Sequence, residues 1–577
     1  MAGWDSYQCE DDGNGAPASA HAGGIEALHE IGAAAKTYLT TLTTQSGLCL
    51  LQQAEIKRAF EDKGERGLFS LFVDDTIKSA WRRWTNQELQ ARGDEPITVS
   101  ELDAYLGLEL AMSLCPLSGL AEFWCGQRFM GQCGFAETMA QSRFQLIRGT
   151  LKTHPLEWAL SATSHPDSLG HSRGLLEHFQ RKFASIAVPF GVSTLDETTV
   201  HTKARMGKGG STRFYAVVGW ESQYVHSIWD DGSGSTLPPP PPAHRYTNLF
   251  PELRTPLDRT LVHPDVTITP DSATALWLAM IGHQTRLMQS PTGRRLLICE
   301  NFYTRHVFAK AVLAFTDGDV KVLGTVRMDL VDRWNKPELK EAFKRVHARQ
   351  RGAWELVGAV DPDPEWEKRQ QEHRQEQSKL PPQQRTKFKP QLMASPNAGF
   401  IVFLDKQVVV FYTNDLAKTP RARVLTDDSD EAAVCCHGLY PLQRWADTES
   451  MTCTTLMVPT IIVAYNNAMN GVDRVNQLRH ARPTHEREKP LELSLLTWVL
   501  DLAVINAYAL QRKLKSSGSA EIPLREFKRR LSEALTESEM LVKARLDRQR
   551  TRNEPETVAD VVGTNASAHI LTPNVKA

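Results

Sequence analysis

The sequence has few cysteines, and none stands in a pattern that binds zinc. Nine cysteines are scattered over 577 residues without a CxxC pair. The adjacent Cys435 and Cys436 are followed by His437, but no second ligand pair stands at zinc spacing. Because structural zinc sites are built from such pairs, we expect reduced thiols, as is typical of a cytosolic or nuclear protein.

The sequence also lacks an excess of charge of one sign. Lysine and arginine number 67 against 68 aspartates and glutamates, a formal net charge of −1. This balance excludes a general attraction to polyanions. Any contact with nucleic acid must therefore come from local basic patches.

A targeting segment and a clear membrane span are missing as well. The first 24 residues are small, polar and rich in Gly and Ala, without the basic and apolar regions of a signal peptide. The longest apolar stretch, residues 491–510, is interrupted by Glu492, Asp501 and Asn506. A buried core helix is favoured over a membrane helix, and we expect no membrane association.

Alternating and apolar runs from residue 188 onward predict a sheet. Residues 188–196 are predicted to be one strand and residues 212–229 a hairpin of two. Residues 294–300 and 319–328 are predicted to be two further strands, each preceded by a helix. This order, with three initial antiparallel strands, predicts an α/β protein with an RNase H-like core.

At 577 residues the chain is too long for one core. A segment dense in charge, Gln and Pro at 361–390 is predicted to be a mobile or helical connector, and a second hairpin follows at 399–415. The predicted division is a disordered N-terminus at 1–24, a helical domain at 25–187, the first part of the core at 188–330, an insertion domain at 331–455, the second part of the core at 456–515, a basic helix at 516–553 and a disordered tail at 554–577.

Three acidic residues are the candidate catalytic and metal-binding groups. Asp196 and Glu300 each end an apolar strand, and Asp473 lies at a helix start or in a loop. Acids at strand ends of one sheet can converge, an arrangement that suits two-metal phosphodiester chemistry. Singly, each also has a structural explanation: a strand-end turn for Asp196, a charge at a helix N-terminus for Glu300 and a helix cap for Asp473.

The motifs around these acids follow one another in a specific order. They are Leu195-Asp196-Glu197 with Lys203-Ala204-Arg205, then Glu300-Asn301-Phe302-Tyr303-Thr304-Arg305 with Gly324-Thr325-Val326-Arg327, then Tyr465-Asn466, Met469, Gly471-Val472-Asp473 and Asn476-Gln477. Looser matches are Trp84-Thr85-Asn86, Leu106-Gly107-Leu108, Phe123-Trp124 and Ser142-Arg143-Phe144. As an ordered set over about residues 70–512, these motifs resemble the piggyBac family of transposases and the domesticated proteins derived from them.

The resemblance implies an RNase H-like core interrupted by an insertion domain between the second and third acids. It implies two Mg²⁺ ions held by Asp196, Glu300 and Asp473. It also implies hydrolytic nicking at transposon ends, hairpin formation by the freed 3′-OH and joining at a TTAA target. The expected partners are DNA and a second copy of the chain in a homodimer, and the expected location is the nucleus.

Basic residues are predicted to contact the DNA. From Arg474 to Arg552 there are 17 Lys and Arg against 10 Asp and Glu, an excess that suits phosphate binding, a solvated helix face or a nuclear-import patch. The predicted DNA contacts are Lys203, Arg205, Arg327, Arg474, Arg479, Arg482, Arg487 and Lys489. The run Pro238–Pro242 is either a polyproline ligand for a protein partner or, more simply, a loop insertion.

Four departures from the family's pattern bear on activity. Glu300 stands where the family has its second Asp, and its longer side chain displaces the carboxylate from the geometry that Mg²⁺ needs. Asn476 replaces a further acid. The family's Lys-Trp motif reads Lys489-Pro490 here, and no cysteine follows Cys453, so we expect no C-terminal zinc domain of the family's kind.

The sequence leaves three functions open. The departures favour a domesticated, DNA-binding protein with weak or lost transposase activity. One alternative is an active, Mg²⁺-dependent DDE/D transposase. The other is a non-enzymatic scaffold for protein interactions.

Overall fold

The computed structural model describes residues 22–553 except for residues 116, 118, 128–130, 157–166, 168, 202–210, 233–239, 287–294, 448–451, 480–490 and 516–520. The predicted disordered tail at 554–577 lies outside the described residues, as does the predicted disordered N-terminus except for residues 22–24, which begin a helix. Of the proline run, Pro238 and Pro239 lie outside them too, and Pro242 begins helix α9.

Helices form most of the N-terminal region. They are α1 (Ala22–Thr44), α2 (Gln53–Ser70), α3 (Asp75–Arg92), α4 (Val99–Ala111), α5 (Cys133–Thr138), α6 (Gln141–Thr150) and α8 (Arg173–Ile186), with short 3₁₀ turns at Met112–Leu114, Leu120–Trp124 and Gly170–Ser172. Helix α2 is broken at Gly64, where a φ of 54° favours glycine. The helical interpretation missed β1 (Gly47–Leu50), which pairs antiparallel with β2 (Ala187–Phe190) in a separate ribbon.

The centre of the molecule is a nine-stranded mixed sheet in the order β11-β8-β9-β10-β7-β6-β3-β4-β5. Its strands are β3 (Val192–His201), β4 (Ser211–Gly219), β5 (Val225–Trp229), β6 (Arg295–Cys299), β7 (Val320–Thr325), β8 (Trp354–Pro362), β9 (Leu392–Leu404), β10 (Val408–Thr413) and β11 (Val424–Thr426). Strands β3, β6 and β7 run parallel, and the other neighbouring pairs are antiparallel. Four of the five strands predicted from residue 188 onward are present. The fifth, predicted at 188–196, is divided at Gly191 into β2, in the separate ribbon, and β3, which continues past Asp196 to His201.

The segment predicted to be an insertion domain extends this sheet. Strand β10 pairs with β7 at Phe411↔Thr325, and β9, β8 and β11 follow outward. Strand β10 thereby supplies hydrogen-bond partners to the backbone groups on the edge of β7. A separate domain would leave those groups unpaired. The segment also contains α13 (Lys336–His347), α14 (Trp366–Ser378), α15 (Asp430–Cys435) and the ribbon of β12 (Leu439–Asp447) with β13 (Thr452–Pro459).

Helices cover both faces of the sheet. Because side chains alternate along a strand, Leu195 and Val217 face one core and Phe214 and Val218 face another. The first core is shared with α9 (Pro242–Leu249), α10 (Arg254–Leu261), α11 (Ala273–Arg286) and α12 (His306–Phe315). The second is shared with the N-terminal helices and with α17 (Gly471–Arg479), α18 (Leu491–Leu514) and α19 (Leu524–Asn553).

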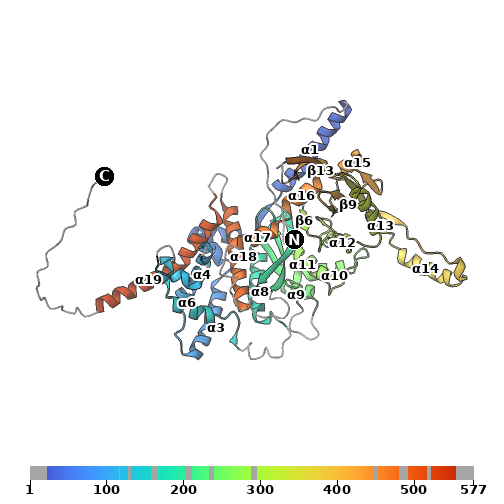
Figure 1. The fold of residues 1–577 in the computed structure, drawn as a ribbon. Helices are drawn as coiled ribbons and strands as arrows, with labels where there is room; N and C mark the ends of the chain where they lie inside the picture. Colours follow the sequence, from blue (N-terminus) through green and yellow to red (C-terminus); the bar gives the residue numbers. More distant parts are fainter. Residues whose placement is uncertain are drawn as a thin grey trace, which may run out of the picture.

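Helix α18 stands between the N-terminal helices and the sheet (Figure 1). It is the described helix with the length and hydropathy to cross a membrane, yet 94% of its apolar window is buried in the protein. Asn506 accepts a hydrogen bond from the backbone N of Val225 at 2.8 Å and donates one to its O at 2.9 Å. Glu492 accepts one from the backbone N of Thr153 at 2.9 Å. Polar residues inside this apolar helix therefore bind it to its neighbours, which confirms the predicted core helix.

Candidate active site

Asp196 lies on β3, between the parallel strand β6 and the antiparallel strand β4. Thr194 and Thr198 are two residues away on either side and share its face of the sheet. The Oδ1 atom of Asp196 accepts a hydrogen bond from the backbone N of Glu197 at 2.7 Å. The carboxyl group is thus held on the face of β3 that α17 covers.

Glu300 directly follows β6, whose register with β3 pairs Leu195 with Cys299. Asp196 and Glu300 directly follow this pair, so they lie side by side on adjacent parallel strands. They stand at the carboxyl end of β6, the edge where α/β sheets place their sites. The carbonyl of Glu300 accepts hydrogen bonds from the N and Oγ1 atoms of Thr304 at 3.1 and 2.9 Å. A Cβ at Gly324 on β7 would lie 2.1 Å from that Oγ1, so only glycine fits beside this turn.

Helix α17 lies along β3 and brings Asp473 to the same place. A Cβ on Gly471 would lie 2.4 Å from the Oγ1 of Thr194. One turn further on, the Oδ1 of Asn476 accepts a hydrogen bond from the Oγ1 of Thr198 at 2.8 Å. Asp473 stands between these two contacts and is exposed to solvent. The structure therefore places the three predicted acids on neighbouring elements: β3, the end of β6 and α17.

The three carboxyl groups act on one another electrostatically. Burial raises the pKa of Asp196 well above its usual value, and the charges of Glu300, Asp473 and Glu197 raise it further. Burial also raises the pKa of Glu300, and the charges of Asp473 and Glu197 add to that effect. Acids that raise one another's pKa attract a cation, because a bound positive charge relieves their repulsion.

The site fits a divalent cation in charge and in donor chemistry, since Mg²⁺ prefers carboxylate oxygens. Just before α17, the buried Oδ1 of Asn470 has no hydrogen-bond partner among the described residues. Within the described residues, no three His, Cys, Asp or Glu side chains are grouped closely enough to hold a metal ion. Joint coordination by Asp196, Glu300 and Asp473 therefore requires their side chains to move closer together.

Tyr465 also belongs to this site, although the sequence interpretation assigned it no role. It lies on α16 (Thr460–Ala468), and its hydroxyl is 3.2 Å from the Oγ1 of Thr325 on β7. Burial raises the pKa of Tyr465, and the charges of Glu300 and Asp196 raise it further. Its place in the motif that ends in Asp473 was the available signal.

Asn476 stands where the family resemblance calls for an acid, and a guanidinium group binds it. The NH1 of Arg479 donates hydrogen bonds to the Oδ1 of Asn476 at 3.0 Å and to the Oγ1 of Thr198 at 3.2 Å. The guanidinium carbon also lies 5.9 Å from the ring centre of Trp498. A positive group therefore sits beside the altered position, and Arg479, a predicted DNA contact, is directed into the protein.

The other predicted DNA contacts differ in their surroundings. Arg327 is exposed and pairs with Asp329 at 2.9 Å. The guanidinium of Arg474 faces the side-chain amide of Gln223. Lys203, Arg205, Arg482, Arg487 and Lys489 lie outside the described residues.

The described part of the basic helix α19 is largely paired within the chain. Arg529 binds Glu526 and Glu533 at 2.7 and 2.5 Å. Arg530 binds Glu526 at 2.7 Å and lies 3.6 Å from Glu65 on α2. These arginines therefore leave little unbalanced positive charge on the described surface of this helix.

Comparison with known proteins agrees with the sequence motifs. A family described as Transposase IS4 matches residues 64–209, which run from α2 through Asp196 to just beyond β3. No curated protein matches the sequence. A cryo-EM structure of a piggyBac transposase synaptic complex with hairpin DNA matches at a TM-score of 0.55 and 15% identity, over 89% of this chain and 90% of that chain. Residues 64–209 thus resemble the Transposase IS4 family, and the fold is similar to that of a piggyBac transposase over most of the chain.

Proposed function

We propose that the chain is a piggyBac-derived, domesticated DNA-binding protein in which metal-dependent strand cleavage is weakened or lost. The observation that carries this proposal is the pairing of Asn476 with Arg479 beside three gathered acids. The framework that assembles Asp196, Glu300 and Asp473 is retained. One negative charge is missing from it, and a cation stands at that position.

An RNase H-like core is part of the proposal. The strand order β5-β4-β3-β6-β7, with β3, β6 and β7 parallel, supports it. Strands β8 to β11 are then the insertion between the second and third acids. Residues 188–330 and 456–515 are the two parts of the core, and residues 331–455 are the insertion.

Asp196, Glu300 and Asp473 would hold Mg²⁺, which activates the attacking oxygen of a phosphodiester reaction and stabilises the leaving oxygen. Strand β3 and helix α17 position the two aspartates. Glu300 reaches one methylene further than Asp, roughly a C–C bond, and groups in such sites need placement within about 0.5 Å. This mismatch weakens turnover more than it weakens cation binding.

DNA as substrate, a homodimer and a nuclear location complete the proposal. DNA is supported by the similar fold of a protein whose structure is a synaptic complex with hairpin DNA. The homodimer and the nuclear location rest on the resemblance of the motifs to the piggyBac family. Residues that surround Asp473 on the exposed side of α17 would face the DNA. The open position of Asp473 leaves room for a phosphate there.

A cleavage assay tests this function. Purified chain is incubated with labelled duplex DNA that carries terminal repeats and TTAA, first with Mg²⁺ and then with Mn²⁺. We expect little or no cleavage by the wild type, and cleavage at least about tenfold faster by the Glu300→Asp, Asn476→Asp double variant, since placement errors cost that much or more. The double variant with Asp196→Asn added should be inactive.

Two outcomes would contradict the proposal. Efficient cleavage by the wild type that is lost in Asp196→Asn would identify an active transposase. Absence of cleavage by the double variant, with DNA binding intact, would show that the altered acids are not the cause of the lost activity.

A further inference from the structure

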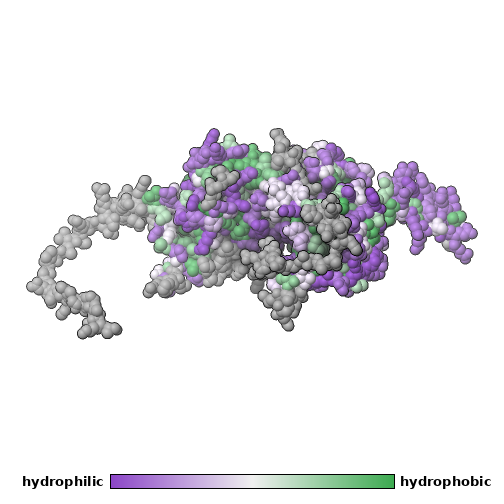
Figure 2. Space-filling view, turned by 90° about the horizontal axis from the view of Figure 1, so that it is seen from above, coloured by the Kyte–Doolittle hydropathy of each residue, from purple (hydrophilic) through white to green (hydrophobic). Residues whose placement is uncertain are grey.

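A projecting arm, residues 363–391, separates β8 from β9. Its two ends are adjacent, because Pro362 pairs with Leu392 in the sheet and the backbone N of Asp363 donates to the O of Gln391 at 3.0 Å. Helix α14 within the arm has no buried residue, and the arm stands clear of the body in two perpendicular views (Figures 1 and 2). The arm is therefore not needed to cover the core.

Aromatic contacts anchor the base of the arm. Trp366, the first residue of α14, packs edge-on against Trp334 with ring centres 5.2 Å apart. The guanidinium carbon of Arg333 lies 4.2 Å from the ring centre of Trp334 and 4.6 Å from that of Trp366. Such cation–π contacts give the arm a defined direction.

The segment that returns from α14 to β9 lies against this helix. The backbone N of Thr386 donates to the Oε1 of Gln377 at 2.7 Å, and the Thr386 hydroxyl is 3.2 Å from Nε2 of His373. Phe388 packs on His373 with ring centres 5.6 Å apart. Thr386 and Phe388 thus contact α14. Beside them, the Nε of Arg385 donates a hydrogen bond to the backbone O of Leu380 at 3.2 Å.

Four basic residues form a basic edge, which we define as Lys379 at the end of α14 with Arg385, Lys387 and Lys389 on the return segment. All four are exposed. No acidic residue occurs between Gln377 and Leu404. The acids of the arm lie earlier, before and on α14, where three basic residues, Lys368, Arg369 and Arg374, offset them in part: Asp363, Glu365, Glu367, Glu372 and Glu376. Positive charge is therefore concentrated from the end of α14 through the return segment.

We propose that the basic edge binds the phosphate backbone of duplex DNA without sequence preference, outside the candidate active site. The proposal deepens the proposed function, on which it rests for the presence of DNA. Spaced cations without intervening acids suit a backbone of regularly spaced phosphates. Phe388 is turned inward onto His373, so it is not offered for the base stacking that single-strand binding uses.

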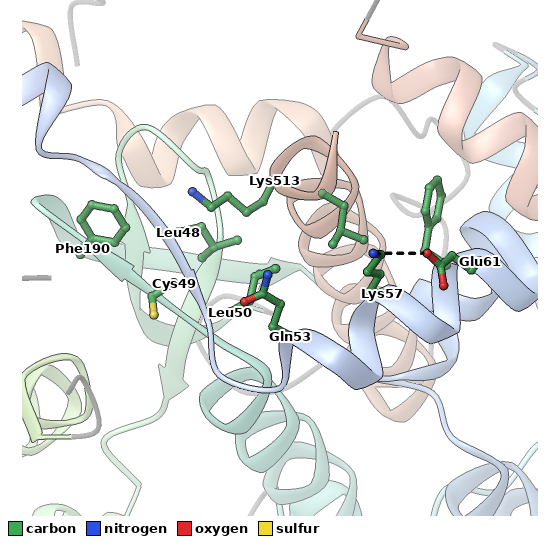
Figure 3. A pocket seen from close by; sticks show the side chains of 10 residues that line it. Leu48, Cys49, Leu50, Gln53, Lys57, Glu61, Phe190 and Lys513 are labelled. Carbon is green, nitrogen blue, oxygen red and sulfur yellow. Dashed lines mark ion pairs between the residues drawn. The ribbon is translucent and has the colours of Figure 1, made fainter. Parts of the chain in front are cut away.

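The hollow of about 740 Å³ beside β1 and α2 is a weaker candidate for a binding surface (Figure 3). Leu48, Leu50 and Phe190 line it together with Lys57, Glu61 and Lys513. Lys57 pairs with Glu61 at 3.7 Å, and nothing about the hollow selects one occupant.

Salt-dependent binding tests the basic edge. The full-length chain carries Lys379→Gln, Arg385→Gln, Lys387→Gln and Lys389→Gln together, and binding to a random-sequence 30-base-pair duplex is followed by fluorescence anisotropy between about 50 and 200 mM salt in EDTA. We expect the slope of log K against log salt to become shallower by about 3–4, since each phosphate contact contributes about 0.9. The loss should be the same for unrelated duplex sequences.

A matched control removes the same charge elsewhere. It carries Arg254→Gln, Arg259→Gln, Lys340→Gln and Lys344→Gln on α10 and α13, all exposed, and its slope should change by less than about 1. A wild-type slope in the basic-edge variant, or an equal change in the control, would overturn the proposal. The proposal would also be overturned if the basic-edge variant lost binding to polyglutamate while its binding to the duplex stayed unchanged. That result would assign the edge to an acidic protein segment.

Failure of the basic-edge proposal can be distinguished from failure of the proposed function. The binding measurement is made in EDTA, where strand cleavage by divalent cations is blocked. An unchanged slope overturns only the basic edge, whereas absence of cleavage by the Glu300→Asp, Asn476→Asp variant overturns only the catalytic proposal.

Discussion

The charges around Asp196 link the candidate site to the stability of the protein. Burial, Glu300, Asp473 and Glu197 raise the pKa of Asp196 above its ordinary value of 3.8. The folded state therefore binds a proton more tightly than the unfolded state. It follows that this group favours folding at low pH, and that the contribution is lost as the pH rises from about 3.8 through the raised folded value.

This repulsion predicts a metal response that does not depend on activity. At pH 7 the metal-free protein should melt at a lower temperature than in the presence of Mg²⁺ or Mn²⁺, because a cation offsets the gathered negative charge. The Asp196→Asn variant should melt above the wild type in EDTA and respond less to metal. Differential scanning fluorimetry from pH 5 to pH 8 measures both effects.

Asp329 serves as the matched control for that measurement. It is an exposed acid paired with Arg327, and Asp329→Asn should leave the metal response as in the wild type. An equal metal response in Asp196→Asn and in the wild type would contradict the inferred cation site.

At the scale of elements, the contact of α17 with β3 sets the position of Asp473. Gly471 allows it, because a Cβ there would lie 2.4 and 2.9 Å from the Oγ1 and Cγ2 of Thr194. A side chain at residue 471 would therefore push the start of α17 away from β3. Asp473, two residues later, would move with it.

Gly471→Ala should consequently destabilise the protein by roughly 1–3 kcal/mol, the usual cost of overpacking, and weaken the metal response. Urea unfolding and the metal-dependent melting shift are the measurements. Adding Thr194→Ala removes both clashing atoms and should recover most of the loss.

The control is Gly149→Ala, on a helix that has room for the added methyl group. No atom lies within 4 Å of the Cβ position at Gly149 in α6, so this change should stabilise by about 0.5–1 kcal/mol. A neutral Gly471→Ala, or a loss that Thr194→Ala does not reduce, would contradict the close approach of α17 to β3.

At the scale of the whole molecule, the arm is an addition to the central sheet, because strands β8 and β9 pair with each other without it. Asp363 and Gln391 are already bonded across its base, and the register of β8 with β9 continues inward from Pro362 and Leu392. Replacing residues 364–390 by Asn-Gly would leave a two-residue hairpin loop, the connection that such strands favour.

This replacement should change the free energy of unfolding by no more than about 1 kcal/mol, since α14 buries no side chain in the core. It should reduce the salt dependence of DNA binding as strongly as the four basic-edge substitutions do. Calorimetry and anisotropy are the measurements. Loss of cooperative unfolding would show that the arm is part of the fold.

The sequence allowed much of the central sheet to be predicted, because strands such as residues 294–300 carry short apolar runs that local periodicity detects. The three acids were singled out through their motifs, and their joint role as a metal site stays a prediction; nearby negative charges raise the pKa of Asp196 and of Glu300. Strand β1 was missed, since four residues give too little pattern. The extension of the sheet was missed because the pairing of β10 with β7 joins residues more than 80 positions apart.

By itself the sequence indicated most strands of the central sheet and the candidate acids, because both depend on residue types over short distances. Only the tertiary structure decided that Arg479 binds Asn476, that Tyr465 contacts Thr325, and that strands β8 to β11 widen the central sheet. Those facts depend on contacts between residues distant in the chain, and packing selects them among many combinations that the local pattern permits.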